Sequence, residues 1–212
     1  MDHYFSADPS VPFQRESVSC EVWGQRLDVV SGSGVYSRGR LDIGTSVLFR
    51  ETQPPAPGRV LDLGTGYGVI GLAIAASWRA DGVPIGADFM VTGVEVNQRA
   101  VLLANENAAR LGLEDRFIAC DPELPRAAAT YHEIWSNPPI RIGKQALHDL
   151  LLYWFGRLAP DGRAVMVVGK NLGGDSLQSW LTDHGYPTTR LAGAKGFRVL
   201  ESRSEDRSDR AT

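Results

Sequence analysis

The stretch Leu61-Asp62-Leu63-Gly64-Thr65-Gly66-Tyr67-Gly68 decides how this chain folds. It joins a short apolar run, residues 60–63, to an apolar helical stretch, residues 68–78, so the pattern predicts a strand that turns into a helix. Glycines at alternate positions let the backbone turn tightly and approach a ligand without clashes from Cβ atoms. The N–H groups at the start of the helix can then meet a carboxylate or a phosphate.

Strand and helix continue to alternate along the rest of the chain. Further strands are predicted at residues 91–96, 117–120, 133–135 and 164–168, and helices at 99–111, 145–158 and 176–184. The strands are continuous runs of apolar residues, which is typical of a parallel sheet covered on both faces. Two short runs, 188–191 and 197–200, are close enough in sequence to pair antiparallel. We therefore predict an α/β fold, a doubly wound Rossmann-like sheet with an antiparallel last strand.

An amino-terminal extension of different character precedes this sheet. Residues 17–30 alternate polar and apolar side chains around a turn, which predicts a hairpin. Gly44 and Thr45 offer a cap for a short helix through residues 47–49, and the proline-rich stretch 54–58 ends it. The predicted organisation is a hairpin and covering segment at 1–56, the main domain at 57–201 and a disordered charged tail at 202–212.

Composition limits the classes of protein that the chain can be. Its 212 residues, 43% of them hydrophobic, suit one domain with a short appendage. A net charge of -3 gives no general attraction to nucleic acid or membrane, so a polyanion would need a local basic patch. The longest apolar helical stretch, 69–76, is far too short to span a membrane, so we expect a cytoplasmic protein. Cys20 and Cys120 have no cysteine or histidine at a ligand spacing, so no metal site is predicted.

Three carboxylates are predicted along the carboxyl edge of the sheet. Asp62 stands just before the glycine loop, where it disfavours a pyrophosphate and favours a cationic amino group. This combination suits S-adenosylmethionine, which carries an ammonium, a carboxylate and a sulfonium. Glu95, within Gly93-Val94-Glu95-Val96-Asn97, ends the second strand and can accept from both hydroxyls of a ribose. Asp121 follows the third strand and could accept from an adenine amino group.

The segment Ser136-Asn137-Pro138-Pro139-Ile140 follows the fourth strand and faces the same edge. The side-chain oxygen of Asn137 and the backbone carbonyl of Pro138 can both accept from one planar NH2 group. Two acceptors on one amino group pull its lone pair out of conjugation and aim it at a methyl carbon. In-line methyl transfer from a cationic donor then depends on positioning and polarisation. Ile140 offers apolar contact without stacking, so recognition of a flat target must come partly from elsewhere.

On these residues the chain resembles the class I S-adenosylmethionine-dependent methyltransferases. Within them it is similar to the small methyltransferase-domain family typified by the ribosomal small-subunit RNA guanine-N2 methyltransferases. The resemblance covers nearly the whole chain, in segments 3–5, 34–45, 61–68, 94–97, 105–108, 136–140 and 195–197. It implies that segment 36–45 covers the cofactor pocket, and that the target amino group is held by Asn137, Pro138, Pro139 and Ile140. The cofactor-binding set that follows is Thr45, Asp62, Gly64, Thr65, Gly66, Tyr67, Gly68, Glu95, Val96, Asn97, Asp121 and Asn137.

Our leading hypothesis is an N-methyltransferase that acts on the exocyclic amino group, N2, of a guanine in ribosomal RNA. Basic residues in the surrounding loops are the candidates for RNA contact: Arg38, Arg40, Arg141, Lys144, Lys170 and Lys195. Two alternatives keep the chemistry and change the target to adenine N6 or a protein glutamine N5. Other classes are an idle RNA-binding or ribosome-assembly factor and a dinucleotide-dependent oxidoreductase, which the glycine spacing and the Asn-Pro-Pro turn disfavour. Monomer and homodimer both remain open.

Overall fold

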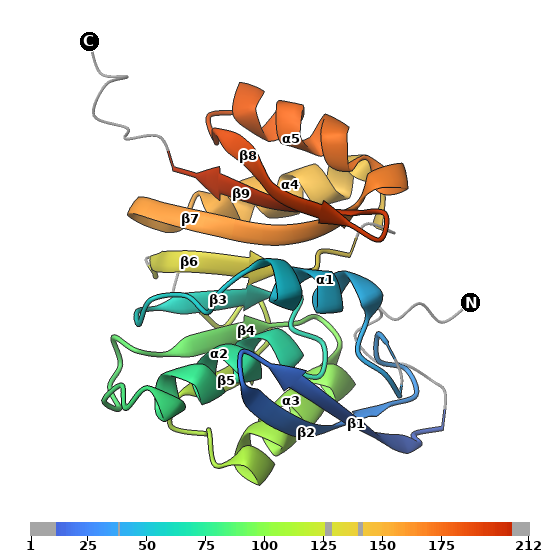
Figure 1. The fold of residues 1–212 in the computed structure, drawn as a ribbon, viewed down its shortest axis with the longest axis vertical. Helices are drawn as coiled ribbons and strands as arrows, with labels where there is room; N and C mark the ends of the chain where they lie inside the picture. Colours follow the sequence, from blue (N-terminus) through green and yellow to red (C-terminus); the bar gives the residue numbers. More distant parts are fainter. Residues whose placement is uncertain (1–11, 38, 126–128, 140–141, 205–212) are drawn as a thin grey trace.

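The structure is a computed structural model that describes residues 12–37, 39–125, 129–139 and 142–204. At its centre lies a seven-stranded sheet (Figure 1). The strands are β3 (Val60–Leu63), β4 (Val91–Val94), β5 (Phe117–Cys120), β6 (Tyr131–Ser136), β7 (Leu158–Gly169), β8 (Thr188–Ala194) and β9 (Phe197–Arg203). Across the sheet their order is β5-β4-β3-β6-β7-β9-β8. Strands β3 to β7 pair in parallel, whereas β9 runs antiparallel to β7 and β8.

The topology confirms the predicted doubly wound α/β sheet with an antiparallel last strand. From β3 the chain adds β4 and β5 on one side and then crosses to place β6 on the other. In open α/β sheets, ligands bind beyond the carboxyl ends of the strands where the direction of winding reverses. The fold therefore points to the ends of β3, β4 and β6 as the place to look for a site.

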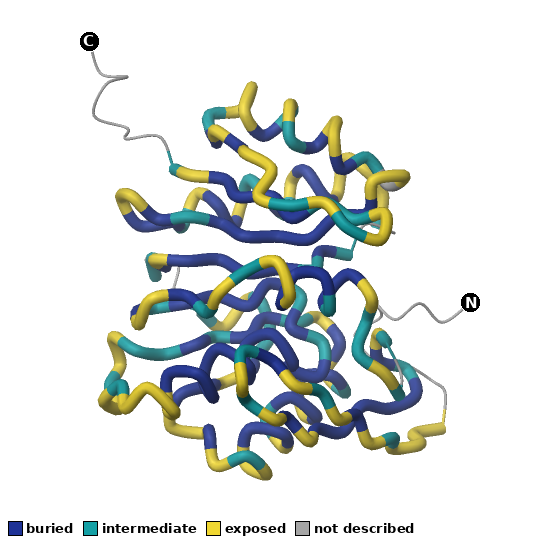
Figure 2. Tube along the Cα trace, in the orientation of Figure 1, coloured by how far each residue is buried: buried dark blue, intermediate teal, exposed yellow. Residues whose placement is uncertain are grey.

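Helices cover both faces of the sheet (Figure 1). One face packs against α1 (Ile43–Glu51), α2 (Val69–Ala80) and α3 (Gln98–Leu111), and the other packs against α4 (Lys144–Phe155) and α5 (Gly174–Asp183). A short 3-10 helix, η2 (Lys170–Leu172), precedes α5. Side chains of β7 alternate between the two cores: Val165 and Val167 join the first, Ala164 and Met166 the second. In Figure 2 the central strands are mostly dark blue, because their residues are buried between the two cores.

The amino-terminal extension forms the predicted hairpin. Its strands β1 (Arg15–Val22) and β2 (Gln25–Gly32) pair antiparallel around Trp23 and Gly24, which both have positive φ. The hairpin lies over α2 and α3 and shares the hydrophobic core of that face. It thus packs on the main sheet's own helices.

Four local predictions need correction. The disordered tail predicted at 202–212 starts too early, because Ser202 and Arg203 are the last residues of β9 and pair with Ala164 and Arg163 of β7. The helix through 47–49 forms as α1, but its cap is Asp42, whose carboxylate accepts from the Thr45 backbone N–H; Gly44 and Thr45 lie inside the helix. The strand predicted at 91–96 ends at Val94, because Asn97 caps α3 and the chain must turn before it. The helix predicted at 145–158 ends at Phe155, since Leu158 already pairs with Tyr131 as the start of β7.

Asn107 joins three separate parts of this face. Its carboxamide is fully buried on α3. The Oδ1 atom accepts from the Val30 backbone N–H at 2.8 Å, and Nδ2 donates to the carbonyl oxygens of Val30 at 2.8 Å and Tyr67 at 2.9 Å. One side chain therefore holds the hairpin and the glycine loop to α3.

Replacing Asn107 with Ala should lower the free energy of unfolding by about 3 kcal/mol, because three buried backbone groups lose their partners. Urea unfolding followed by tryptophan fluorescence measures the loss. Glu106→Ala on the same helix is the control: it removes only the exposed ion pair with Arg15, so its loss of stability should be far smaller than that of Asn107→Ala. Equal losses in the two variants would contradict a structural role for Asn107.

Candidate functional site

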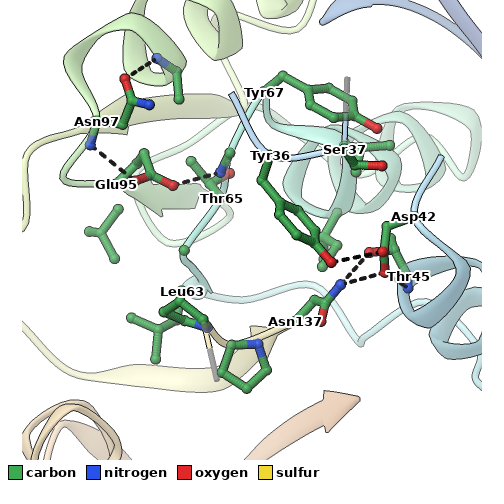
Figure 3. A pocket seen from close by; sticks show the side chains of 18 of the residues that line it. Tyr36, Ser37, Asp42, Thr45, Leu63, Thr65, Tyr67, Glu95, Asn97 and Asn137 are labelled. Atoms are coloured by element: carbon green, nitrogen blue, oxygen red, sulfur yellow. Dashed lines mark hydrogen bonds between the residues drawn. The ribbon is translucent and has the colours of Figure 1, made fainter. Parts of the chain in front are cut away.

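A cavity of about 250 Å³ lies at the carboxyl ends of β3, β4 and β6 (Figure 3). Parallel pairing sets Leu63 level with both Val94 and Ser136, so the next residues of all three strands emerge side by side. Eleven of the predicted site residues line the cavity: Thr45, Gly64, Thr65, Gly66, Tyr67, Glu95, Val96, Asn97, Asn137, Pro138 and Pro139. The sheet thus brings the glycine loop and the Asn-Pro-Pro turn into one cavity.

Other predicted residues lie elsewhere. Asp62, Gly68 and Asp121 are absent from the cavity lining, as are the exposed Arg40, Lys144 and Lys170. Arg38, Ile140 and Arg141 lie outside the described residues.

The glycine loop leaves room for a ligand. Gly64 and Gly66 both have positive φ, at 73° and 56°, where a side chain would be strained. A Cβ built on Gly66 would meet no atom within 4 Å, so this part of the loop faces open space. Gly68 differs, because a Cβ there would come within 3.2 Å of the Ala104 Cβ. Its bare backbone serves the close packing of α2 on α3.

Glu95 links the ends of β3 and β4. Its Oε2 accepts from the Gly66 backbone N–H at 3.1 Å and its Oε1 from the Asn97 N–H at 3.0 Å. Burial raises the pKa of this carboxyl, and the backbone N–H groups oppose that rise. Each carboxylate oxygen has a further lone pair, so Glu95 could also accept from the hydroxyls of a ligand at the cavity wall.

Asp62 lies beneath the loop and is fully buried. Its Oδ2 accepts from the Thr65 hydroxyl and from the Gly71 N–H at 2.9 Å, while Oδ1 has no hydrogen-bond partner among the described residues. Burial raises the pKa of the carboxyl to about 6, against the opposing effect of those two hydrogen bonds. A cation near the loop would stabilise the ionised form.

Asp121 belongs to the turn after β5. Its carboxylate accepts from the Gln98 side-chain amide at 3.0 Å and from the Glu123 N–H at 2.9 Å. The adjacent Pro122 lines the cavity. Asp121 is therefore near the cavity and caps a turn, and its predicted contact with an adenine remains a prediction.

The carboxamide of Asn137 meets the amino-terminal extension across the cavity (Figure 3). Its Nδ2 donates to Asp42 Oδ2 at 2.8 Å and to Thr45 Oγ1 at 3.0 Å. The Tyr36 hydroxyl donates to the other oxygen of Asp42 at 2.8 Å. The sequence analysis placed Asp42 and Tyr36 within the segment that covers the pocket but gave neither an individual role; the signal for Asp42 was its place just before a helix, where Asp is a favoured cap.

Aromatic side chains border the same cavity. Tyr36, Trp154 and Phe197 are among its lining residues, and the Tyr36 side chain is 43% exposed. Tyr36 is exposed and Phe197 partly exposed, so these two rings offer flat apolar surface, whereas Trp154 is buried in the hydrophobic core of the α4 face. Tyr36 and Phe197 are therefore the structural candidates for the contact that Ile140 cannot give by stacking.

The described part of the chain gives no sign of a metal centre. Within it, no three His, Cys, Asp or Glu side chains come together as metal ligands. Both cysteines, Cys20 and Cys120, are free. None of the helices in the described ranges has the length and apolar character needed to cross a membrane.

Comparisons with known proteins give a consistent result. The family described as "Methyltransferase small domain" matches residues 26–201. The chain is 30% identical to the uncharacterized protein YbxB of Bacillus subtilis, over 95% of this chain and 98% of that protein. It is 32% identical to the ribosomal RNA small subunit methyltransferase C of Pseudomonas aeruginosa, over 93% of this chain but only 57% of that enzyme.

Solved structures share the fold. A 16S rRNA N2 methyltransferase of Thermus thermophilus, determined in complex with AdoMet and guanosine, superposes with a TM-score of 0.72 at 23% identity. The match covers 93% of this chain and 52% of that one. A ribosomal protein methylase of Lactobacillus delbrueckii has a TM-score of 0.59 at 19% identity, over 78% of this chain and 85% of that one.

Asp62→Asn should become more stable relative to the native protein as the pH rises from about 4 to about 6, and the difference should then level off. The folded-state pKa lies above the unfolded one, so the folded protein loses stability as this carboxyl ionises, by about 3 kcal/mol. Urea unfolding at several pH values measures the difference.

Asp28→Asn is a control of opposite sign. The Ser19 hydroxyl and Arg26 hold the pKa of the Asp28 carboxyl below its usual value, so its ionised form stabilises the folded state. That variant should lose stability relative to the native protein as the pH rises toward about 4, and the difference should then stay nearly constant from pH 4 to 6. A difference for Asp62→Asn that is flat across pH 4 to 6 would contradict a buried, proton-retaining carboxyl.

Proposed function

The chain belongs to the methyltransferase small domain family, and we propose that it transfers a methyl group from S-adenosylmethionine to the exocyclic amino group, N2, of a guanine in ribosomal RNA. One observation carries this proposal: the glycine loop and the Asn-Pro-Pro turn line a single cavity. A methyl donor on the loop and an amino group on the turn would therefore meet. The named function of the Pseudomonas aeruginosa relative supports ribosomal RNA as the substrate.

The residues present fit the proposed cofactor. The open space at Gly66 accommodates its amino-acid part, Glu95 accepts from its ribose, and Asp62 below the loop favours its cationic end. Bound there, S-adenosylmethionine supplies a methyl group activated by a positively charged sulfur. The Thermus thermophilus neighbour, which shares this fold, was determined with AdoMet and guanosine.

The chain's own residues position the amino group that receives the methyl. The Asn137 side-chain oxygen and the Pro138 carbonyl oxygen each accept a hydrogen bond from one N–H of this amino group. Together they turn its lone pair toward the methyl carbon. The new N–C bond forms as the C–S bond breaks, and the amino group then loses one proton to water. Tyr36, Ser37, Asp42 and Thr45 line one part of the cavity, where their side chains would displace solvent that competes with the target amino group.

We expect RNA to contact basic side chains on the surface and the aromatic side chains that border the cavity. Arg40, Lys144 and Lys170 are exposed and can approach phosphates, whose contacts position RNA and make affinity depend on salt. Tyr36 and Phe197 border the cavity and offer flat faces to a base. The chain spans a little over half of the Pseudomonas aeruginosa enzyme, so these contacts are proposed for this chain alone.

A labelled-methyl assay tests the substrate. Ribosomal subunits and total RNA from cells lacking the protein are incubated with it and S-adenosylmethionine carrying a labelled methyl group, and the products are digested and separated. Label in N2-methylguanosine is the expected result. Label in N6-methyladenosine or in a glutamine side chain would be consistent with methyl transfer but would overturn guanine as the target. Absence of label in every fraction would contradict methyltransferase activity on ribosomal RNA and ribosomal proteins.

Asn137→Ala should reduce the rate of methyl transfer by at least about 100-fold, because it removes one of the two acceptors that polarise the amino group. Its dissociation constant for S-adenosylmethionine, measured by calorimetry, should stay within about threefold of the native value. Wild-type turnover in this variant would remove the basis of the proposed mechanism.

Glu95→Gln is the matched comparison, because it should act on cofactor binding. Its amide can keep one of the two backbone N–H contacts but must set an NH2 group against the other, and it loses the charge that accepts from the ribose. The dissociation constant for S-adenosylmethionine should rise about tenfold. An unchanged constant would contradict a cofactor-binding role for Glu95.

A further inference from the structure

We propose that Asp42 is a positioning residue that fixes the orientation of the Asn137 carboxamide, so that its side-chain oxygen faces the substrate. The inference rests on the proposed function, in which that oxygen accepts from the target amino group. It concerns a residue of the amino-terminal extension that acts on a residue of the main sheet, 95 positions away in sequence.

The argument starts from the donors and acceptors of a carboxamide. Its NH2 group has two N–H donors, and its oxygen only accepts. In Asn137 the NH2 group donates to Asp42 Oδ2 at 2.8 Å and to Thr45 Oγ1 at 3.0 Å (Figure 3). Both donors are thereby used within the protein, which leaves the carbonyl oxygen as the part of the side chain that can meet an amino group.

Asp42 makes this orientation one-sided. An ionised carboxylate cannot donate, so turning the Asn137 amide by half a turn would set its oxygen against another oxygen with negative charge. Thr45 alone would not distinguish the two orientations of the Asn137 amide, because a hydroxyl can donate as well as accept. The contact with a charged acceptor also draws electron density toward the carbonyl oxygen of Asn137, which strengthens it as an acceptor.

The Asp42 carboxylate is itself held in place. It caps α1, where Oδ2 accepts from the Thr45 N–H at 3.0 Å, and its Oδ1 accepts from the Tyr36 hydroxyl at 2.8 Å. A Cβ on Gly44 would come within 2.9 Å of Oδ2, so glycine at that position leaves the space that the carboxylate occupies. Both oxygens of Asp42 thus contact protein donors, which suits a positioning role and not a proton acceptor.

Two substitutions separate the possible roles of Asp42. Asp42→Ser keeps the helix cap, because a serine hydroxyl also accepts from this backbone N–H, but it is too short to reach Asn137. Asp42→Asn keeps an oxygen at the position of Oδ2, and its NH2 group can donate to the Tyr36 hydroxyl. The serine variant therefore loses the orienting contact, while the asparagine variant retains its geometry without the charge.

The kinetic test uses the labelled-methyl assay on ribosomal subunits. Asp42→Ser should lower kcat about 100-fold, while the dissociation constant for S-adenosylmethionine and the midpoint of thermal unfolding stay close to the native values. Asp42→Asn should retain at least about a tenth of the native kcat. Native kcat in Asp42→Ser, with Asn137→Ala inactive, would overturn this inference and leave the proposed function standing.

Two further outcomes are distinguishable. If Asp42→Asn is as inactive as Asp42→Ser although both bind the cofactor normally and the side-chain NH2 signals of Asn137 in Asp42→Asn stay at their native positions, the carboxylate acts as a proton acceptor and the positioning role is wrong. If Asn137→Ala itself retains activity, the proposed role of the Asn137 oxygen in methyl transfer is wrong, and the inference about Asp42, which rests on it, is wrong as well.

A measurement without substrate tests the contact directly. In protein labelled with 15N, the side-chain NH2 signals of Asn137 are identified by their loss in Asn137→Ala. They should shift in Asp42→Ser and remain closer to their native positions in Asp42→Asn. Identical signals in the native protein and in Asp42→Ser would overturn the inference whatever the substrate proves to be.

Discussion

The parallel pairing of β3 with β4 on one side and β6 on the other is the constraint on which the site depends. It sets Leu63, Val94 and Ser136 at one level, so Gly64, Glu95 and Asn137 leave the sheet together. A shift of one residue in either pairing would turn these side chains to opposite faces. The buried apolar residues on both sides of each strand oppose such a shift, because it would exchange the residues of the two cores.

The amino-terminal extension supplies the side chains that complete the cavity at the carboxyl edge of the sheet. Asn107 ties the hairpin to α3 and the glycine loop, and Asn97 donates to the Gly34 carbonyl at 2.7 Å. These contacts hold the start of the segment that carries Tyr36 and Asp42 across the cavity. The site is therefore built from two parts of the chain that sequence patterns describe separately, and the orientation of the Asn137 amide depends on both.

Much of the fold could be predicted because its signals are local. The strand at 60–63 and the helix after it follow from an apolar run, a glycine loop and a second apolar run with helical length. Boundaries were less accurate where distant contacts decide them, as at Leu158, which joins β7 because Tyr131 pairs with it. Asp62 was counted among the cofactor-binding residues, and the structure places it under the loop, outside the cavity lining, where Thr65 and Gly71 hold it.

The sequence by itself determined the order of elements, the glycine loop and the Asn-Pro-Pro turn, because periodicity and backbone restriction act over a few residues. Only the tertiary structure decided which side chains share the cavity and which way the Asn137 amide points. That orientation depends on Asp42, Thr45 and the charge of one carboxylate, brought from a remote part of the chain. Hydrogen-bond partners at such separations are selected by packing and strand register, and no local pattern records them.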